Sequence, residues 1–365
     1  KSNINRISKL QDPKLTVINK QPRLDLTNKN LYMFRSWTKE NSPILPIFHI
    51  DKNKNDSYKL WIHTNAIAER LDLSSKKSLE IFFDRFESFP LLDKWQNYLT
   101  EEICNASKFN VGEINDAISL CIDLNAENEI TNWSFQLTKV KCSLLVENKH
   151  LESLLKRKSN TRITSRILKP IKEYIEDLDK IIEISNAFRK KQLLNGKIEI
   201  PKPTNNIESL KELLIHNPVD FSKEYFEPFN KNDVQSYLTP LLYEANLLWC
   251  KHSSKYGLNT ASYISQELDY VNVSEIIRNT ELIDSDIELN DNGTLTFNQL
   301  VEQCSDGNKK RILDKILINV LRDNEVKLIT NELNINESEK IIAPWTLPSY
   351  DFINLINQYS IYNMI

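Results

Sequence analysis

Two long segments in which apolar and polar side chains alternate constrain the fold of this chain more than any other feature. The first runs through residues 118–124 and the second through residues 130–146, and the stretch 125–128 between them has the composition of a turn. Side chains along a strand point alternately to the two faces of a sheet, so this arrangement predicts a β-hairpin. Residues 59–63 alternate in the same way and predict a further half-buried strand.

Helical patterns flank and follow the hairpin. Apolar residues recur at intervals of three and four through residues 168–189 and 234–256, which predicts two long helices, and Gly257 is placed to end the second. Pro240 lies inside that second helix, where a proline costs about 3 kcal/mol unless a kink accommodates it. We also expect a mostly helical stretch at 66–86 and two helices within 298–321.

Composition and charge exclude several classes of protein. A hydrophobic fraction of 40% and a charged fraction of 27% over 365 residues are typical of a folded globular protein. The net charge of −3 gives no overall attraction to phosphate backbones, which argues against a dedicated RNA-binding protein. The five glycines form neither G-x-G-x-x-G nor G-x-x-x-x-G-K, so dinucleotide and P-loop nucleotide sites are excluded.

The cysteines, the histidines and the apolar runs point to an intracellular, soluble protein. The five cysteines form no C-x-x-C pair, so we expect buried free thiols in a reduced compartment. The five histidines lack H-x-x-x-H spacing, which favours structural roles over metal binding. No run approaches the ~18 apolar residues of a membrane span. High Lys, Asn and Ile content suits an AT-rich genome, so we expect a plastid or cytoplasmic protein.

The sequence Q-P-R-L-D-L-T at 21–27, the strand pattern at 59–63 and the hairpin at 113–146 together resemble the RNB domain of the ribonuclease II/R family, most closely its cyanobacterial and plastid type. The resemblance implies an α/β fold in which helices wrap a mixed β-sheet around a central channel. Family enzymes usually carry OB-fold domains on either side of the RNB domain, and we expect this chain to be without them. It also implies a short strand at 90–92 and a short helix at 151–155. We expect residues 1–20 to be an N-terminal extension and residues 21–365 to form a single RNB-like domain, truncated at its C-terminal part relative to the family.

The resemblance also shows what this chain has lost. In the family, an Asp and a D-x-D-D run that hold magnesium follow the R-x-D-L-T sequence. Counted from Thr27 without a gap, these four positions fall on Arg35, Asn41, Pro43 and Ile44, and none is a carboxylate. Because magnesium prefers oxygen ligands, usually carboxylates, in near-octahedral geometry, we expect no catalytic residues here and no magnesium cofactor.

A second motif near the end of the chain has changed in the same way. Residues 344–352 resemble the family sequence T-S-P-I-R-R-Y-x-D, which opens a helix and supplies an arginine to the scissile phosphate. Tyr350 and Asp351 replace its two arginines, and we expect Asp351 to repel a phosphate. We further expect Trp37, Trp345 and Tyr350 to reduce the channel. The sequence thus favours a catalytically inactive protein retained as a structural or regulatory subunit, with other protein subunits as partners.

Two alternatives stay open. A rival register makes Glu113, Asp116 and Asp123 a weak magnesium site, which would leave a weakly active 3′ to 5′ exoribonuclease. RNA binding is the other alternative, because Lys and Arg give sequence-independent affinity for phosphate backbones. The candidate RNA-binding residues lie in two basic clusters, although solvated helix faces are the more frequent role of such runs: Lys156, Arg157 and Lys158, and Lys309, Lys310 and Arg311.

Overall fold

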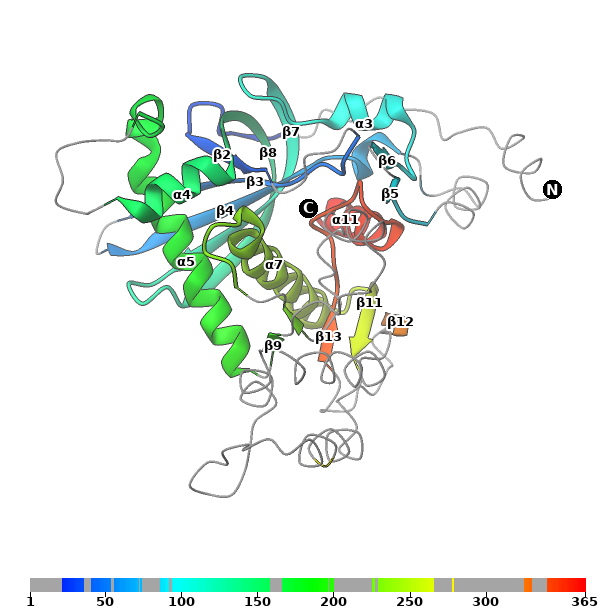
Figure 1. Ribbon diagram of the computed structural model, residues 1–365. Helices are drawn as coiled ribbons and strands as arrows, with labels where there is room; N and C mark the ends of the chain where they lie inside the picture. The colour runs from blue at the N-terminus through cyan, green and yellow to red at the C-terminus, as the bar shows by residue number, and fades with distance from the viewer. Residues whose placement is uncertain are drawn as a thin grey trace.

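The structure of the protein is a computed structural model (Figure 1). The described residues are 22–35, 41–53, 56–71, 73, 86–91, 94–157, 166–195, 197–199, 225–226, 229–265, 278, 325–329 and 340–365.

The centre of the fold is a mixed β-sheet that closes on itself. Its strands are β1 (Leu24–Asp25), β2 (Leu31–Phe34), β3 (Ile47–Lys52), β4 (Tyr58–Asn65), β7 (Ile114–Leu124) and β8 (Ile130–Val146). They run in the order β1-β8-β2-β3-β4-β7, and the additional pairing of β7 with β8 closes the circuit. β1 and β2 lie parallel to β8, whereas the other neighbours are antiparallel. The predicted hairpin is confirmed as β7 and β8, and the predicted strand at 59–63 as β4.

One face of this sheet is covered by helices (Figure 1). The helices are α4 (Asn148–Lys156), α5 (Ile175–Leu194), α7 (Val234–Tyr256) and α11 (Phe352–Met364), and their apolar residues form one large core with those of the strands. The opposite face, which we call the inner face, carries a smaller apolar cluster that includes Ile44, Ile47, Trp61 and Phe109. The expected α/β fold, with helices wrapping a mixed sheet, is therefore confirmed.

The local signals for α7 are borne out in detail. Asp233 caps its N-terminus by accepting a hydrogen bond from the Gln235 backbone N–H at 3.0 Å. Gly257 ends it in the left-handed region at φ 66°, where a side chain would be strained. Pro240 stays inside the helix, and its carbonyl accepts a hydrogen bond from the buried Gln192 amide at 3.0 Å.

Other predicted elements differ in part from the structure. The predicted helix at 168–189 begins as a 3-10 helix, η3 (Lys169–Tyr174), with non-helical backbone at Ile171, and continues as α5. Of the helical stretch expected at 66–86, only a 3-10 turn, η2 (Ala68–Arg70), lies within the described residues. The helices expected within 298–321 lie outside them. The implied short strand and helix are confirmed as β5 (Phe89–Leu91) and α4.

The remaining described elements are short. They are β6 (Lys94–Gln96), α3 (Glu101–Ser107), β9 (Ile198–Glu199), β10 (Tyr225–Phe226), β11 (Thr260–Ser265), β12 (Glu325–Ile329) and β13 (Lys340–Ile342). Four cysteines in the described segments carry free thiols, and two of them, Cys121 and Cys142, are buried as expected. Within the same segments, no helix has the length and apolar character needed to cross a membrane.

Candidate functional site

The two altered motifs meet in space although they lie at opposite ends of the chain. The backbone N–H of Ile44 donates a hydrogen bond to Ser349 Oγ at 2.7 Å, across 305 positions of sequence. Two further hydrogen bonds fix the segment that carries Ser349. Ser88 Oγ donates to the Ser349 carbonyl at 3.0 Å, and the buried Tyr98 hydroxyl donates to the Pro348 carbonyl. The segment after β2 and the segment before α11 therefore form one site.

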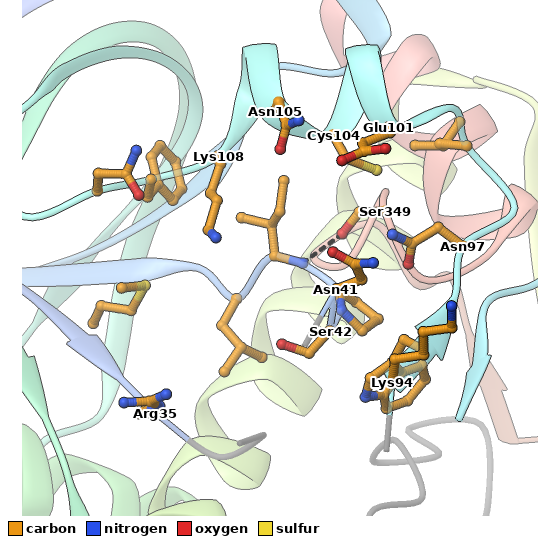
Figure 2. A pocket seen from close by; sticks show the side chains of 18 of the residues that line it. Arg35, Asn41, Ser42, Lys94, Asn97, Glu101, Cys104, Asn105, Lys108 and Ser349 are labelled. Atoms are coloured by element: carbon orange, nitrogen blue, oxygen red, sulfur yellow. Dashed lines mark hydrogen bonds between the residues drawn. The ribbon is translucent and has the colours of Figure 1, made fainter. Parts of the chain in front are cut away.

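A cavity of about 640 Å³ opens at this junction (Figure 2). All four positions that replace the family's carboxylates line it, together with Ser349. One wall comes from α3 and the loop that follows it, and another from β6. The four positions predicted to replace the carboxylates thus line one cavity: Arg35, Asn41, Pro43 and Ile44.

The side chains at the four predicted positions do not suit magnesium. Pro43 and Ile44 carry no side-chain oxygen, Asn41 offers only a neutral amide, and Arg35 brings a fixed positive charge. Arg35 Nη1 instead pairs with Glu147 Oε1 at 3.2 Å, at the start of α4. Nowhere in the described part of the chain do three or more His, Cys, Asp or Glu side chains gather in a way that could hold a metal ion.

The residues that replace the two arginines of the second motif play structural roles. Asp351 is buried with 3% of its surface exposed, and its carboxylate caps α11 by accepting a hydrogen bond from the Asn354 backbone N–H at 2.7 Å. Tyr350 packs against the main apolar core. Neither residue lines the cavity, so the expectation that Asp351 faces a phosphate is wrong.

The expectation that Trp37, Trp345 and Tyr350 reduce the central channel stays a prediction, and the two of them that the structure describes pack in or against the main core. Trp345 is fully buried in the main core, where its Nε1 donates to the Ala245 carbonyl at 3.0 Å and its ring packs edge-on against Phe135. Neither Trp345 nor Tyr350 lines the cavity, and Trp37 lies outside the described residues. Among the described tryptophans, Trp95 lines it.

The structure does not bring the alternative metal ligands together. Asp116 and Asp123 lie seven positions apart on β7, a separation of about 23 Å along a strand, whereas one magnesium ion binds its ligands at about 2.1 Å. Each carboxylate already has a partner: Asp116 pairs with Arg23 at 3.3 Å and Asp123 with Lys59 at 2.9 Å. Glu113 accepts a hydrogen bond from Asn110. The prediction of a shared cation site at these residues is therefore wrong.

The first basic cluster is engaged in ion pairs on the surface. Lys156 Nζ lies 3.3 Å from Glu152 one helical turn away, and Arg157 pairs with Asp179 of α5. Lys158 and the second cluster, Lys309, Lys310 and Arg311, lie outside the described residues. The paired state of Lys156 and Arg157 suits a solvated helix face and gives no sign of a phosphate site.

Sequence reasoning missed a buried polar chain on the inner face. His49 Nδ1 lies 2.8 Å from His63 Nε2, and His63 Nδ1 lies 2.7 Å from Ser119 Oγ, which lies 2.6 Å from Thr138 Oγ1. Burial holds the pKa of His63 well below its usual value. Burial also lowers the pKa of His49, although Asp51, at 3.3 Å from its Nε2, opposes that effect. These histidines are structural, as their lack of ligand spacing predicts.

Comparison with known proteins gives the family and the fold. The family model of the RNB domain matches residues 23–364. RNase R of Mycoplasma genitalium in complex with ribose-methylated single-stranded RNA has a TM-score of 0.69 at 13% identity, with 98% of this chain and 53% of that chain covered. Yeast Ssd1, a pseudonuclease, has a TM-score of 0.66 at 12% identity, with 97% and 42% covered.

An active-site mutant of the Dss1 exoribonuclease from Candida glabrata has a TM-score of 0.64 at 13% identity, with 100% of this chain and 45% of that chain covered. No curated protein sequence matches this chain. The chain spans about half the length of the RNase R structures it resembles. One of these similar structures is a pseudonuclease and another is a mutant of an exoribonuclease. The fold alone therefore does not distinguish an active from an inactive protein, and the residues of the site must be considered.

Proposed function

The chain belongs to the RNB-domain family, and from that membership we propose that it is a catalytically inactive member that serves as a structural or regulatory subunit of a larger assembly. The observation that carries this proposal is the composition of the cavity. The four positions that would supply carboxylates gather around it, and they present a guanidinium, an amide and two side chains without oxygen. Hydrolysis of a phosphodiester by metal ions needs those ions held and oriented, and this donor set offers no means to do so.

A retained scaffold supports the second half of the proposal. The sheet, its helices and the hydrogen bond between Ile44 and Ser349 preserve the architecture of the site although its chemical groups have changed. Selection that keeps a fold without its chemistry acts on some other property of the molecule, and a protein-binding surface is the property that a subunit requires.

A nuclease assay tests the loss of activity. The full chain is incubated with a 5′-labelled oligoribonucleotide and either magnesium or manganese, and we expect the length of the oligonucleotide to stay constant. Steady shortening from the 3′ end would contradict the proposal if it changed in a Lys108→Glu variant, because Lys108 lines the cavity. Shortening that is identical in both proteins would come from a contaminating nuclease.

Isolation of the native protein tests the subunit role. We expect the protein to be recovered in a complex of defined stoichiometry, with its partners identified by mass spectrometry. A native protein that migrates only as a free monomer would contradict this role.

RNA binding without cleavage is the second candidate function, and the charge of the cavity favours it. Of the described residues that line the cavity, Arg35, Lys94 and Lys108 are cationic and Glu101 is the only carboxylate. A local excess of positive charge attracts phosphate even where the whole chain has a net charge of −3. The weakly active exoribonuclease finds no support, because its proposed carboxylates lie apart along β7.

A further inference from the structure

We propose that residues 108–114, which we call the α3–β7 segment, form with the neighbouring part of β8 a docking surface for a partner protein. The partner that fits this surface presents a segment with both acidic and aliphatic side chains. This inference rests on the proposed function, because a subunit needs a surface that another protein covers.

Two aliphatic side chains of the α3–β7 segment are held in solvent. Val111 has 52% of its surface exposed and Ile114 has 64%, whereas Ile118 and Leu120, further along β7, are fully buried. Single exposed apolar residues are normal on a protein surface, but apolar surface that gathers in one place marks an interaction site. Val111 also lines the cavity, so the exposed segment continues into it.

Hydrogen bonds fix the α3–β7 segment in this conformation. The Gly112 N–H donates to the Cys142 carbonyl at 2.8 Å, and the Asn115 amide donates to the Lys108 carbonyl at 3.1 Å. Gly112 has a φ of 86°, and in the described structure no residue beyond its chain neighbours lies within 4 Å of the position that a Cβ would occupy. The segment is therefore ordered beside open space, and an ordered surface loses little conformational entropy when a partner binds.

Three exposed lysines surround the two aliphatic side chains. Lys108 begins the segment and lines the cavity (Figure 2), and Lys141 lies opposite Ile114 in the register of β7 and β8, with Lys139 two positions away on β8. Paired residues of neighbouring strands point to the same face of a sheet, so Lys139 and Lys141 share the face of Ile114. None of these lysines forms an ion pair with another residue of the described segments.

The carboxylates of the same region are engaged by neighbours in the chain. Each accepts a hydrogen bond or forms an ion pair: Glu113 with Asn110, Asp116 with Arg23 and Asp25 with Thr27. The three lysines thus carry the charge that is left for another molecule. Because interfaces place opposite charges against each other, these lysines favour an acidic partner.

The aliphatic character of the segment favours a protein over RNA. Proteins that bind single-stranded RNA stack its bases on aromatic side chains or on arginine planes. The aromatic residue of the segment, Phe109, has 2% of its surface exposed and offers no such platform. Val111 and Ile114 can instead bury apolar surface against the side chains of another protein.

Selection from a phage-displayed library of random dodecapeptides on the immobilised full chain tests this surface. Enriched peptides are synthesised, and their affinities for the chain and its variants are measured by fluorescence polarisation. We expect the enriched peptides to be rich in Asp or Glu and in aliphatic residues. Their affinity should fall roughly tenfold or more in Ile114→Asp, the loss expected when one buried aliphatic contact is removed, and also in Lys108→Glu.

Leu194→Asp and Lys156→Glu are the matched controls. Leu194 has 78% of its surface exposed at the end of α5, and Lys156 is an exposed lysine of α4, so each control makes the same chemical change outside the segment. The affinity of both controls should equal that of the unaltered protein. Thermal unfolding of all four variants should show that none disturbs the fold.

Three peptide results would overturn the inference: no enriched peptide, enriched peptides without acidic residues, or equal affinities in the segment variants and the controls. A short oligouridylate, titrated into the same proteins, adds a fourth. If it binds more tightly than the peptides and weakens in both Ile114→Asp and Lys108→Glu, the surface is an RNA site.

Failure of this surface is distinct from failure of the proposed function. A native complex together with peptides that do not depend on the α3–β7 segment leaves the subunit role standing and removes this docking surface. A chain that binds acidic peptides through the segment but is recovered from its source only as a monomer keeps the surface and loses the subunit role.

Discussion

The buried imidazole pair on the inner face predicts that the protein loses stability as the pH falls below about 6.5. His63 has 0% of its surface exposed and lies 2.8 Å from His49. Burial disfavours the charged imidazole and keeps the pKa of His63 well below the usual value of 6.5. The folded protein therefore keeps His63 neutral at a pH at which the unfolded chain takes up a proton. Stability is fully retained above the unfolded pKa and declines as the pH falls through 6.5 towards the folded pKa.

The size of this effect follows from proton linkage. A proton taken up only by the unfolded state lowers the free energy of unfolding by at most about 1.4 kcal/mol per pH unit. For an unfolded pKa near 6.5, a change from about pH 7 to about pH 5.5 removes about 1.2 kcal/mol through His63 alone. His49 contributes in the same direction but by less, because Asp51 partly offsets the lowering of its pKa.

Urea-induced unfolding of the full chain over this pH range tests the prediction. In a His63→Gln variant, the slope of the unfolding free energy against pH should decrease by the amount that corresponds to about one proton taken up on unfolding, whatever the change in absolute stability. His252→Gln is the control, because His252 lies on α7 and is only half-buried, so its replacement should change the slope less. An unchanged slope in His63→Gln would show that this imidazole is protonated in the folded protein, and the reasoning would be wrong.

Two further predictions concern α11 and α7, and both are measured by urea-induced unfolding. Gln358→Leu should cost about 1–3 kcal/mol, because the fully buried amide accepts from the Ala68 N–H at 3.0 Å, and that N–H would lose this partner, whereas the Asn65 carbonyl, to which the amide donates at 2.8 Å, keeps a hydrogen bond from the Ile67 N–H. Ser360→Ala on the same helix should cost less than about 0.5 kcal/mol, and equal effects would contradict this account. Gly257→Ala should cost about 1 kcal/mol because of its φ of 66°, and a neutral or stabilising effect would refute the strain argument.

The sequence could predict those parts of the fold whose signals are local. Helix α7 has apolar residues at helical spacing, a capping Asp233 and a terminating Gly257, so both of its ends follow from a few neighbouring residues. The hairpin of β7 and β8 follows equally from alternation around a turn. The closure of the sheet could not be predicted from such signals. β2 pairs in parallel with the end of β8, more than one hundred residues later, and no local pattern encodes that register.

The residues of the candidate site could likewise be predicted only in part from the sequence. The four positions that the resemblance assigns to carboxylates follow a motif at fixed spacing, and all four line one cavity, while their correspondence to the family's metal ligands stays a prediction. The lysines of that cavity carry no such signal. Lys94 lies in the short strand β6 and Lys108 directly follows α3, and neither belongs to a motif. Only the placement of these elements beside the loop of the first motif makes both lysines part of the cavity lining.

Two positions to which the family resemblance assigns chemical groups have structural roles in this chain. Ile44 has 9% of its surface exposed and belongs to the inner apolar cluster, so Ile44→Asp would place a carboxylate where burial costs several kcal/mol unless a metal or hydrogen bonds compensate. Asp351→Arg would remove the cap of α11, a loss of about 1 kcal/mol, and bury a guanidinium at a position with 3% exposure. Each single substitution towards the family's residue should therefore lower the free energy of unfolding, because the present side chain at that position contributes to the packing or the capping of the fold.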